Sequence, residues 1–199
     1  MERLVVARHA ESEYSARGAL NGDPSIVVSL TDEGRAQAQE LGRALAGEPI
    51  GVCAVTEFAR TRETAEIALA GREIPLLVVP ELNDHPAGDY EGRPITEYLE
   101  WAYAATPADV VPGGTESRAA VIERFASGFR VLLDRPEPVV LAVLHSLPIA
   151  YLLSAAEGRD PANRMGMLPY AERRDLTGED VERAVVRLER WHAGLPSKG

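Results

Sequence analysis

The feature that most constrains the fold is the alternation of short apolar runs with amphipathic segments. Four apolar runs predict buried strands, at residues 4–7, 50–55, 76–79 and 139–144. Segments with apolar residues at helical spacing follow them, in the order expected of βα units. We therefore expect an α/β fold, a three-layer α/β/α sandwich with a mostly parallel central sheet. No linker, repeat or low-complexity tract divides the chain, so a single domain is predicted over residues 1–199.

Capping residues mark the predicted helices. Thr31 and Thr115 each precede a run with helical periodicity and are expected to be N-caps. Long irregular segments at 8–29 and 81–94 interrupt the pattern, and loops of this length in a compact domain are usually functional. Helices are expected at about 31–47, 57–69, 95–104, 115–134, from 148 onward and at 177–192.

Charge and composition limit the partners that the chain can have. The formal net charge of −10 at pH 7 argues against nucleic acid or an anionic membrane as partner. No apolar stretch is long enough to span a bilayer, and no signal-peptide core is seen. The one cysteine, Cys53, excludes an internal disulfide and fits a reducing compartment. We expect a cytoplasmic protein, and a homodimer is left open.

Three predicted strands end in side chains suited to phosphate chemistry. Arg8 and His9 follow the first strand, Arg60 begins the helix after the second, and His145 follows the fourth. Asp84, on the loop after the third strand, supplies a carboxyl group. The carboxyl ends of parallel strands meet at one edge of a sheet, where α/β proteins bind ligands. Guanidinium groups bind phosphoryl oxygens and a neutral imidazole can attack phosphorus, so a phosphate-ester site is predicted there.

Several motifs occur in order between about residues 3 and 155. Arg8-His9-Ala10-Glu11 matches an Arg-His-Gly-Glu motif with alanine for glycine. Residues 30–38 match Leu-Thr-x-x-Gly-x-x-Gln-Ala. Residues 56–65 match Ser-x-x-x-Arg-Ala-x-x-Thr-Ala with threonine at the first and sixth positions, and 88–92 match Gly-Asp-Trp-Glu-Gly with tyrosine for tryptophan. Each match is weak alone, but together with His145 after an apolar strand they are specific. The chain resembles the histidine phosphatase superfamily, also called the phosphoglycerate mutase-like family.

The resemblance implies a mechanism. His9 is the nucleophile and becomes a phosphohistidine. Arg8, Arg60 and His145 hold the phosphoryl oxygens as charge spreads over them. Asp84 protonates the leaving oxygen and then takes a proton from the attacking water. The two arginines disfavour the imidazolium form of His9, and no step requires a metal or another cofactor. The expected reaction is hydrolysis of a small phosphorylated metabolite.

Three positions depart from the family pattern. Asp84 replaces the commoner glutamate and is one methylene shorter, about 1.5 Å of reach, so its loop has to approach more closely. Ser15 stands where many members have an asparagine that helps to bind phosphate, and Ser146 replaces a frequent glycine. Both serines are candidate substrate-binding residues. Asp89 and Glu11 are the alternative proton donors.

The sequence disfavours two other classes of phosphatase. A cysteine phosphatase needs Cys-x5-Arg, but the sixth residue after Cys53 is Ala59. A metallohydrolase built on His9, His85, His145 and Asp84 lacks the usual ligand spacings. A phosphoglycerate mutase-type phosphotransferase and a catalytically weak homologue that binds a phosphorylated ligand remain as alternatives.

The sequence does not identify the substrate. Residues that can line the leaving-group pocket occur on the loops and on the helix after the third strand. They are Tyr14, Arg17, His85, Arg93 and Trp101.

Overall fold

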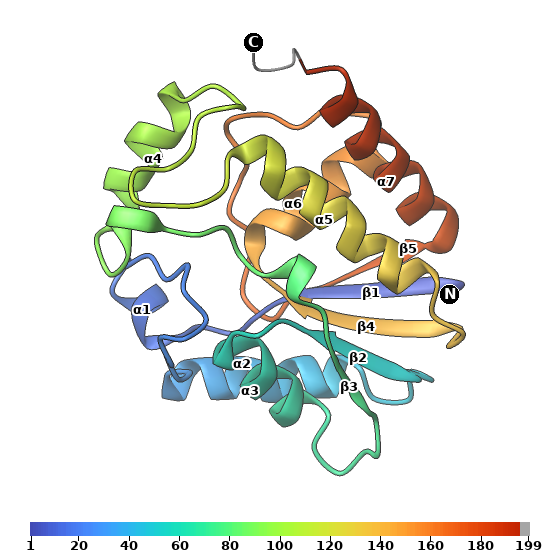
Figure 1. The fold of residues 1–199 in the computed structure, drawn as a ribbon. Coiled ribbons are helices and arrows are strands. Elements are labelled where there is room, and N and C mark those ends of the chain that lie inside the picture. The colour runs from blue at the N-terminus through green and yellow to red at the C-terminus, as the bar shows by residue number, and fades with distance from the viewer. Residues whose placement is uncertain (196–199) are drawn as a thin grey trace.

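Apolar runs without a polar face form the centre of a five-stranded sheet. In a computed structural model, which describes residues 1–195, the strand order is β3-β2-β4-β1-β5 (Figure 1). Neighbours among the first four strands are parallel, while β5 pairs antiparallel with β1, which confirms the expected α/β fold with a mostly parallel sheet. The strands are β1 (Arg3–Arg8), β2 (Val52–Val55), β3 (Leu76–Val78), β4 (Val139–Leu144) and β5 (Arg173–Thr177).

Helices cover both faces of the sheet, because successive side chains of a strand point to opposite faces and both sets are apolar here. Leu4 and Val6 of β1 belong to the core beneath one helical layer, and Val5 and Ala7 to the core beneath the other. The first layer holds α5 (Arg118–Leu133), α6 (Ser146–Ala156) and α7 (Gly178–Ala193), and the second holds α2 (Asp32–Ala44) and α3 (Ala59–Ala68) (Figure 1).

Shorter elements lie beyond the carboxyl ends of the strands. They come from the two segments that were expected to be irregular and from the predicted helix at 95–104. They are α1 (Glu13–Ala16), the 3₁₀ turns η1 (Pro80–Leu82) and η2 (Gly88–Tyr90), and α4 (Ile95–Ala104) (Figure 1).

The structure confirms one of the two predicted caps and corrects the other. Thr31 accepts a hydrogen bond from the Gly34 amide, as expected of an N-cap, and Thr177 caps α7. The prediction of Thr115 as a cap is wrong: Ser117 caps α5, its hydroxyl accepting from the Ala120 amide. α1 was not predicted, and neither was β5, where only Leu176 is buried.

The strand order brings the predicted chemistry together. β1 and β4 are neighbours in a register that pairs Arg8 with Leu144, and the His9 amide donates to the Leu144 carbonyl over 2.8 Å. The residues that follow, His9 and His145, therefore emerge side by side. β2 lies on the other side of β4, so the start of α3, which carries Arg60, arrives at the same edge.

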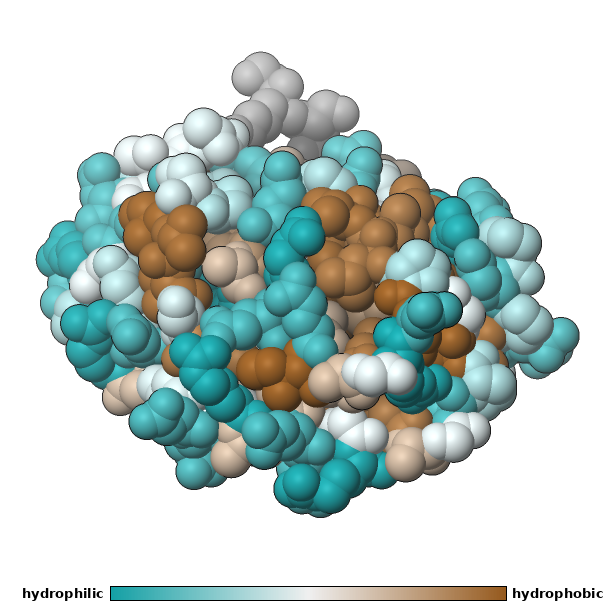
Figure 2. All heavy atoms as spheres, turned by 90° about the horizontal axis from the view of Figure 1, so that it is seen from below, coloured by the Kyte–Doolittle hydropathy of each residue, from teal (hydrophilic) through white to brown (hydrophobic). Residues whose placement is uncertain are grey.

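The outer surface carries both hydrophilic and apolar residues. Seen from the side of α2 and α3, hydrophilic residues surround separate apolar patches (Figure 2). Val27 and Met167 are the most exposed of the large apolar side chains, and scattered residues of this kind are normal on soluble proteins. No helix within residues 1–195 combines the length and the apolar character that a bilayer span requires. The homodimer stays a prediction.

A substitution at Gly34 would test how closely α2 packs against the segment after β1. A Cβ at this position would overlap the carbonyl oxygen of Glu11. Gly34→Ala should therefore lower the free energy of unfolding by about 2 kcal/mol, although the same change in a free helix gains about 1 kcal/mol. Denaturant titration measures this. Ala36→Gly on the exposed face of the same helix should cost only about 1 kcal/mol, and a Gly34→Ala protein as stable as the parent would contradict the packing.

Candidate active site

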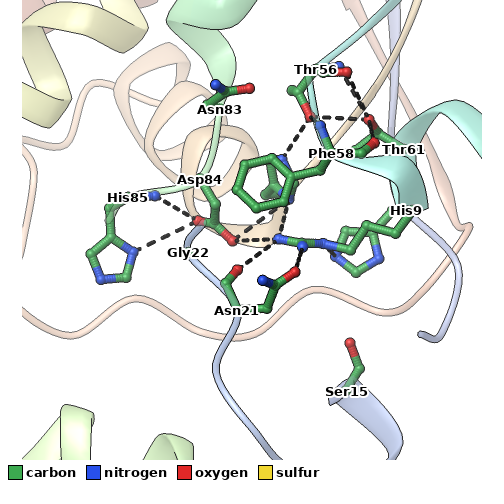
Figure 3. Close-up of polar contacts among 12 residues, drawn as sticks. His9, Ser15, Asn21, Gly22, Thr56, Phe58, Thr61, Asn83, Asp84 and His85 are labelled. Carbon is green, nitrogen blue, oxygen red and sulfur yellow. Dashed lines mark hydrogen bonds and ion pairs between the residues drawn. The ribbon is translucent and has the colours of Figure 1, made fainter. Parts of the chain in front are cut away.

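The guanidinium of Arg60 is the centre of the polar cluster at the strand ends. This side chain, in the first turn of α3, is almost fully buried. Its Nε donates to His9 Nε2 over 3.1 Å, and its Nη2 donates to His145 Nδ1 over 3.0 Å. Nη2 also lies 3.4 Å from Asp84 Oδ2, and Nη1 donates to Asn21 Oδ1 over 2.5 Å. Figure 3 shows His9, Asn21 and Asp84 pointing toward this common centre.

The hydrogen bonds fix the tautomers of the two histidines. His9 Nδ1 lies 2.7 Å from the Ala10 carbonyl oxygen, so it carries the proton and donates. The lone pair of His9 Nε2 then faces Arg60. In His145, Nδ1 accepts from Arg60, so Nε2 carries the proton and donates to Thr56 Oγ1 over 3.0 Å. The two rings lie 5.4 Å apart, edge to face.

Both histidines are neutral at neutral pH. Burial lowers the pKa of His9 well below its ordinary value, and the charges of Arg60 and Arg8 lower it further. Burial and then Arg60 lower the pKa of His145 to about 3, although Asp84 opposes the shift. A neutral imidazole with its Nε2 lone pair toward a buried cation is a nucleophile aimed at the place where an anion would bind.

Asp84 is a carboxylate in the unliganded protein. Burial by itself raises the pKa of Asp84, but the hydrogen bond from His85 and the positive charge of Arg60 hold it below its ordinary value. The His85 amide donates to Asp84 Oδ1 over 3.1 Å, and His145 Nδ1 lies 3.6 Å from Oδ2. The carboxyl group of Asp84 thus lies beside Arg60, which also contacts His9 and His145.

Arg124 of α5 holds the loop that carries Asp84. Its guanidinium donates to the backbone carbonyls of Glu81, Asn83 and Asp84 over 2.9, 2.8 and 3.3 Å. The same group pairs with both carboxylate oxygens of Glu116. One partly buried cation therefore fixes the path of the backbone, which places the short Asp84 side chain near the strand ends.

Arg8 is held by the segment between α6 and β5. Its Nη1 donates to the Leu168 carbonyl over 2.7 Å, and its guanidinium carbon lies 3.9 Å from the centre of the Tyr170 ring. Its Nε is buried and has no hydrogen-bond partner. A donor without an acceptor at this position is available to a bound anion.

A cavity of about 220 Å³ opens beside this cluster. It runs from the strand ends to α4 and to the segment between α6 and β5. His9, Arg8, Arg60 and Asp84 line it at one end, and aromatic and aliphatic side chains line the rest, namely Tyr14, Ile95, Tyr98, Leu99, Trp101, Tyr103, Tyr151, Met165, Met167 and Tyr170.

The two predicted serines also line the cavity. The Ser15 hydroxyl lies 2.9 Å from that of Ser12, which caps α1, and Figure 3 shows Ser15 apart from the Arg60 cluster. Ser146, the first residue of α6, accepts a hydrogen bond from the Leu168 amide over 2.9 Å. Both are near enough to meet a ligand, and each already has a protein partner.

The structure separates the three candidate proton donors. Asp84 lines the cavity, whereas Glu11 and Asp89 do not. Glu11 accepts a hydrogen bond from the Thr31 hydroxyl over 2.8 Å, so its carboxylate supports the start of α2.

The predicted leaving-group residues divide in the same way. Tyr14, His85 and Trp101 line the cavity, but Arg17 and Arg93 do not. Arg17 donates to the Glu13 carbonyl, and Arg93 pairs with Glu97 on α4.

Sequence reasoning missed several residues of the site, and Asn21 is the clearest case. Asn21 accepts from Arg60 through both its side chain and its backbone carbonyl. Glu91 binds the Asn21 side-chain amide over 3.0 Å and the Gly22 amide over 2.7 Å. A Cβ on Gly22 would overlap the backbone at Ala87, so only glycine fits this approach. Glu91 belongs to the Gly-Asp-Tyr-Glu-Gly motif, which was the available signal.

Two alternative chemistries find no geometric support. Cys53 is fully buried inside β2, and burial raises the pKa of its thiol to about 12, which disfavours the thiolate that a cysteine phosphatase needs. Within the described part of the chain, no three side chains of His, Cys, Asp or Glu are grouped so that they could hold a metal ion.

Comparison with known proteins identifies the family. The model of the histidine phosphatase superfamily (branch 1) matches residues 4–191. The chain belongs to this superfamily. A relative from Salmonella typhimurium named adenosylcobalamin/alpha-ribazole phosphatase is 34% identical over 165 residues, 76% of this chain and 80% of that protein. One from Cronobacter sakazakii, named as a probable phosphoglycerate mutase, is 27% identical over 97% of this chain and 89% of its own.

Solved structures share the fold. The alpha-ribazole phosphatase of Shigella flexneri superposes with a TM-score of 0.74 at 24% identity, covering 87% of this chain and 89% of its own. A mycobacterial glucosyl-3-phosphoglycerate phosphatase gives a TM-score of 0.72 at 24% identity, covering 91% and 93%.

The buried neutral histidines of this superfamily member predict a pH-dependent stability. Below pH 6.5 both histidines take up a proton in the unfolded chain but not in the folded protein. The free energy of unfolding therefore decreases as the pH is lowered. The free energy of unfolding should decrease by about 2.5 kcal/mol from pH 7 to 5.5, roughly half from each histidine. His145→Gln should remove half of this dependence, and His192→Gln on α7 should leave it intact. Denaturant titrations that give equal stability at both pH values would contradict the neutral forms.

Proposed function

We propose that this protein is a phosphomonoester hydrolase that acts through a phosphohistidine on His9. The observation that carries the proposal is the Arg60 guanidinium, which orients the lone pair of His9 and contacts His145 and Asp84 at once. The family membership and the phosphatases among the relatives support the same reaction. The substrate is a small phosphorylated metabolite, no metal or other cofactor takes part, and the protein acts in the cytoplasm.

In the first step the phosphoryl group takes the place of the histidines as the acceptor for Arg60. Arg8, whose Nε has no partner, and Arg60 then bind phosphoryl oxygens. His9 Nε2 attacks phosphorus, a nitrogen–phosphorus bond forms, and the bond from phosphorus to the leaving oxygen breaks. The added negative charge raises the pKa of Asp84, which therefore holds a proton and donates it to the leaving oxygen.

In the second step water attacks the phosphohistidine. Asp84, now a carboxylate, takes a proton from the water, the nitrogen–phosphorus bond breaks, and inorganic phosphate leaves with His9 neutral again. The proton lost in the first step is thereby restored.

The remaining site residues bind the phosphoryl oxygens. The bound dianion raises the pKa of His145, so that its Nδ1 gains a proton and becomes a donor. α6 begins directly after His145, so the positive end of its dipole lies at the same strand end and favours an anion there. Ser15 and Ser146 complete the set with their hydroxyl groups.

Removal of the nucleophile tests the proposal. His9→Ala should lower kcat for phosphate monoesters by at least about 10⁴-fold, because the two-step route is lost. His192→Ala, a histidine on α7 outside the cavity, serves as the control and should retain the parent rate. Turnover by His9→Ala near the parent rate, or activity that a chelator removes and zinc restores, would favour a metallohydrolase.

The proton donor is tested with two classes of leaving group. Asp84→Asn should slow hydrolysis of alkyl phosphates by about 10²–10⁴-fold. Aryl phosphates should be slowed far less, because a phenolate of low pKa leaves without a proton. Asp89→Asn is the matched control and should show no such selectivity. If Asp84→Asn slows both classes equally, Asp84 has a structural role instead.

A further inference from the structure

Unpaired buried nitrogens gather in one part of the molecule. Among the side chains of residues 1–195, the buried nitrogens without a hydrogen-bond partner are Nε of Arg8, both ring nitrogens of His85 and Nε of Arg118, and of these His85 Nδ1 lies 3.8 Å from Asp84 Oδ1. All three residues line the cavity. Buried polar groups in folded proteins nearly always have a hydrogen-bond partner, so a cluster of unpaired ones indicates a ligand. Arg8 belongs to the phosphate end, whereas His85 and Arg118 have no part in the steps described above.

His85 and Arg118 lie at the aromatic part of the cavity. The His85 ring is 4.6 Å from that of Tyr98, which is 5.9 Å from the ring of Trp101. Arg118, the first residue of α5, is close enough that its charge opposes the rise that burial causes in the pKa of Tyr98 and of Tyr151. Two aromatic rings of α4 therefore line the same cavity as an arginine.

Within residues 1–195, no carboxylate lies within ion-pair distance of Arg118. Its buried Nε has no hydrogen-bond partner there. Glu116 lines the same cavity but is bound through both oxygens by Arg124. Asp109 also lines it and accepts from the Thr106 amide. A guanidinium without a counter-ion in a partly apolar cavity favours an oxyanion, which it can bind through two hydrogen bonds.

We propose that this part of the cavity is a leaving-group subsite that selects a phosphate monoester carrying a carboxylate. Arg118 binds the carboxylate, and a flat apolar body of the leaving group packs against Tyr98 and Trp101. His85 supplies a further hydrogen-bonding group beside it. The inference rests on the proposed phosphatase function, since it names the substrate class of the same site.

The test compares two substrates that differ only in this charge, 4-carboxybenzyl phosphate and 4-carbamoylbenzyl phosphate. Their alkoxide leaving groups are alike at the reacting oxygen, so the ratio of kcat/KM reports the remote group. We expect the parent protein to favour the carboxylate by about 10-fold or more, and Arg118→Gln to lower the ratio by about 10- to 100-fold, as for a charge-assisted hydrogen bond. Arg118→Lys keeps the charge and should restore part of the preference.

Arg183→Gln, which removes an equal charge from α7 outside the cavity, is the matched control and should keep the ratio. A ratio near one in the parent protein, or a ratio that Arg118→Gln does not change, would overturn the subsite even where both esters are hydrolysed through His9. If neither ester is hydrolysed, the proposed function fails. The same ratio is then measured as dissociation constants of the two corresponding benzylphosphonates by calorimetry, with the same expected and contradicting results.

Discussion

The arrangement of this site depends on one buried cation, the guanidinium of Arg60. Burial lowers its pKa to about 10, with Asp84 opposing the shift, so it stays charged at neutral pH. A buried charge is tolerated only where hydrogen-bond acceptors surround it, and here His9, His145 and Asn21 provide them. Together with burial, these contacts keep both histidines neutral, and they turn the lone pair of His9 toward Arg60.

This local charge also explains how an acidic protein can attract an anion. The chain carries a formal charge of −10, yet the phosphate end of the cavity holds Arg8 and Arg60 against one carboxylate, Asp84. At the short distances inside a cavity these groups outweigh distant surface charges, which solvent and salt screen. A phosphoryl dianion can balance this excess of positive charge. We infer that its negative charge raises the pKa of Asp84 and of His145 enough for each to take up a proton.

The sequence predicted those features that depend on local pattern. The βα alternation and the strand ends led to Arg8, His9, Arg60 and His145, because neighbouring parallel strands must end at one edge. Features set by tertiary contacts were missed. β5 has one buried residue and is recognised only by its pairing with β1. Asn21, Tyr170 and Arg124 reach the site through the paths of loops and a distant helix, which no periodicity encodes. The Ser117 cap lies two residues from the predicted one, a shift that apolar spacing cannot resolve.

The most direct test of the account is to trap the covalent intermediate. Protein mixed with a rapidly hydrolysed aryl phosphate, quenched in alkali within milliseconds and digested, would be examined by mass spectrometry under conditions that preserve phosphohistidine. The proposed mechanism predicts one phosphoryl group on the peptide that contains His9, at Nε2, and none in His9→Ala. Phosphorylation at His145 instead, or turnover with no phosphorylated protein at any time before the steady state, would contradict it.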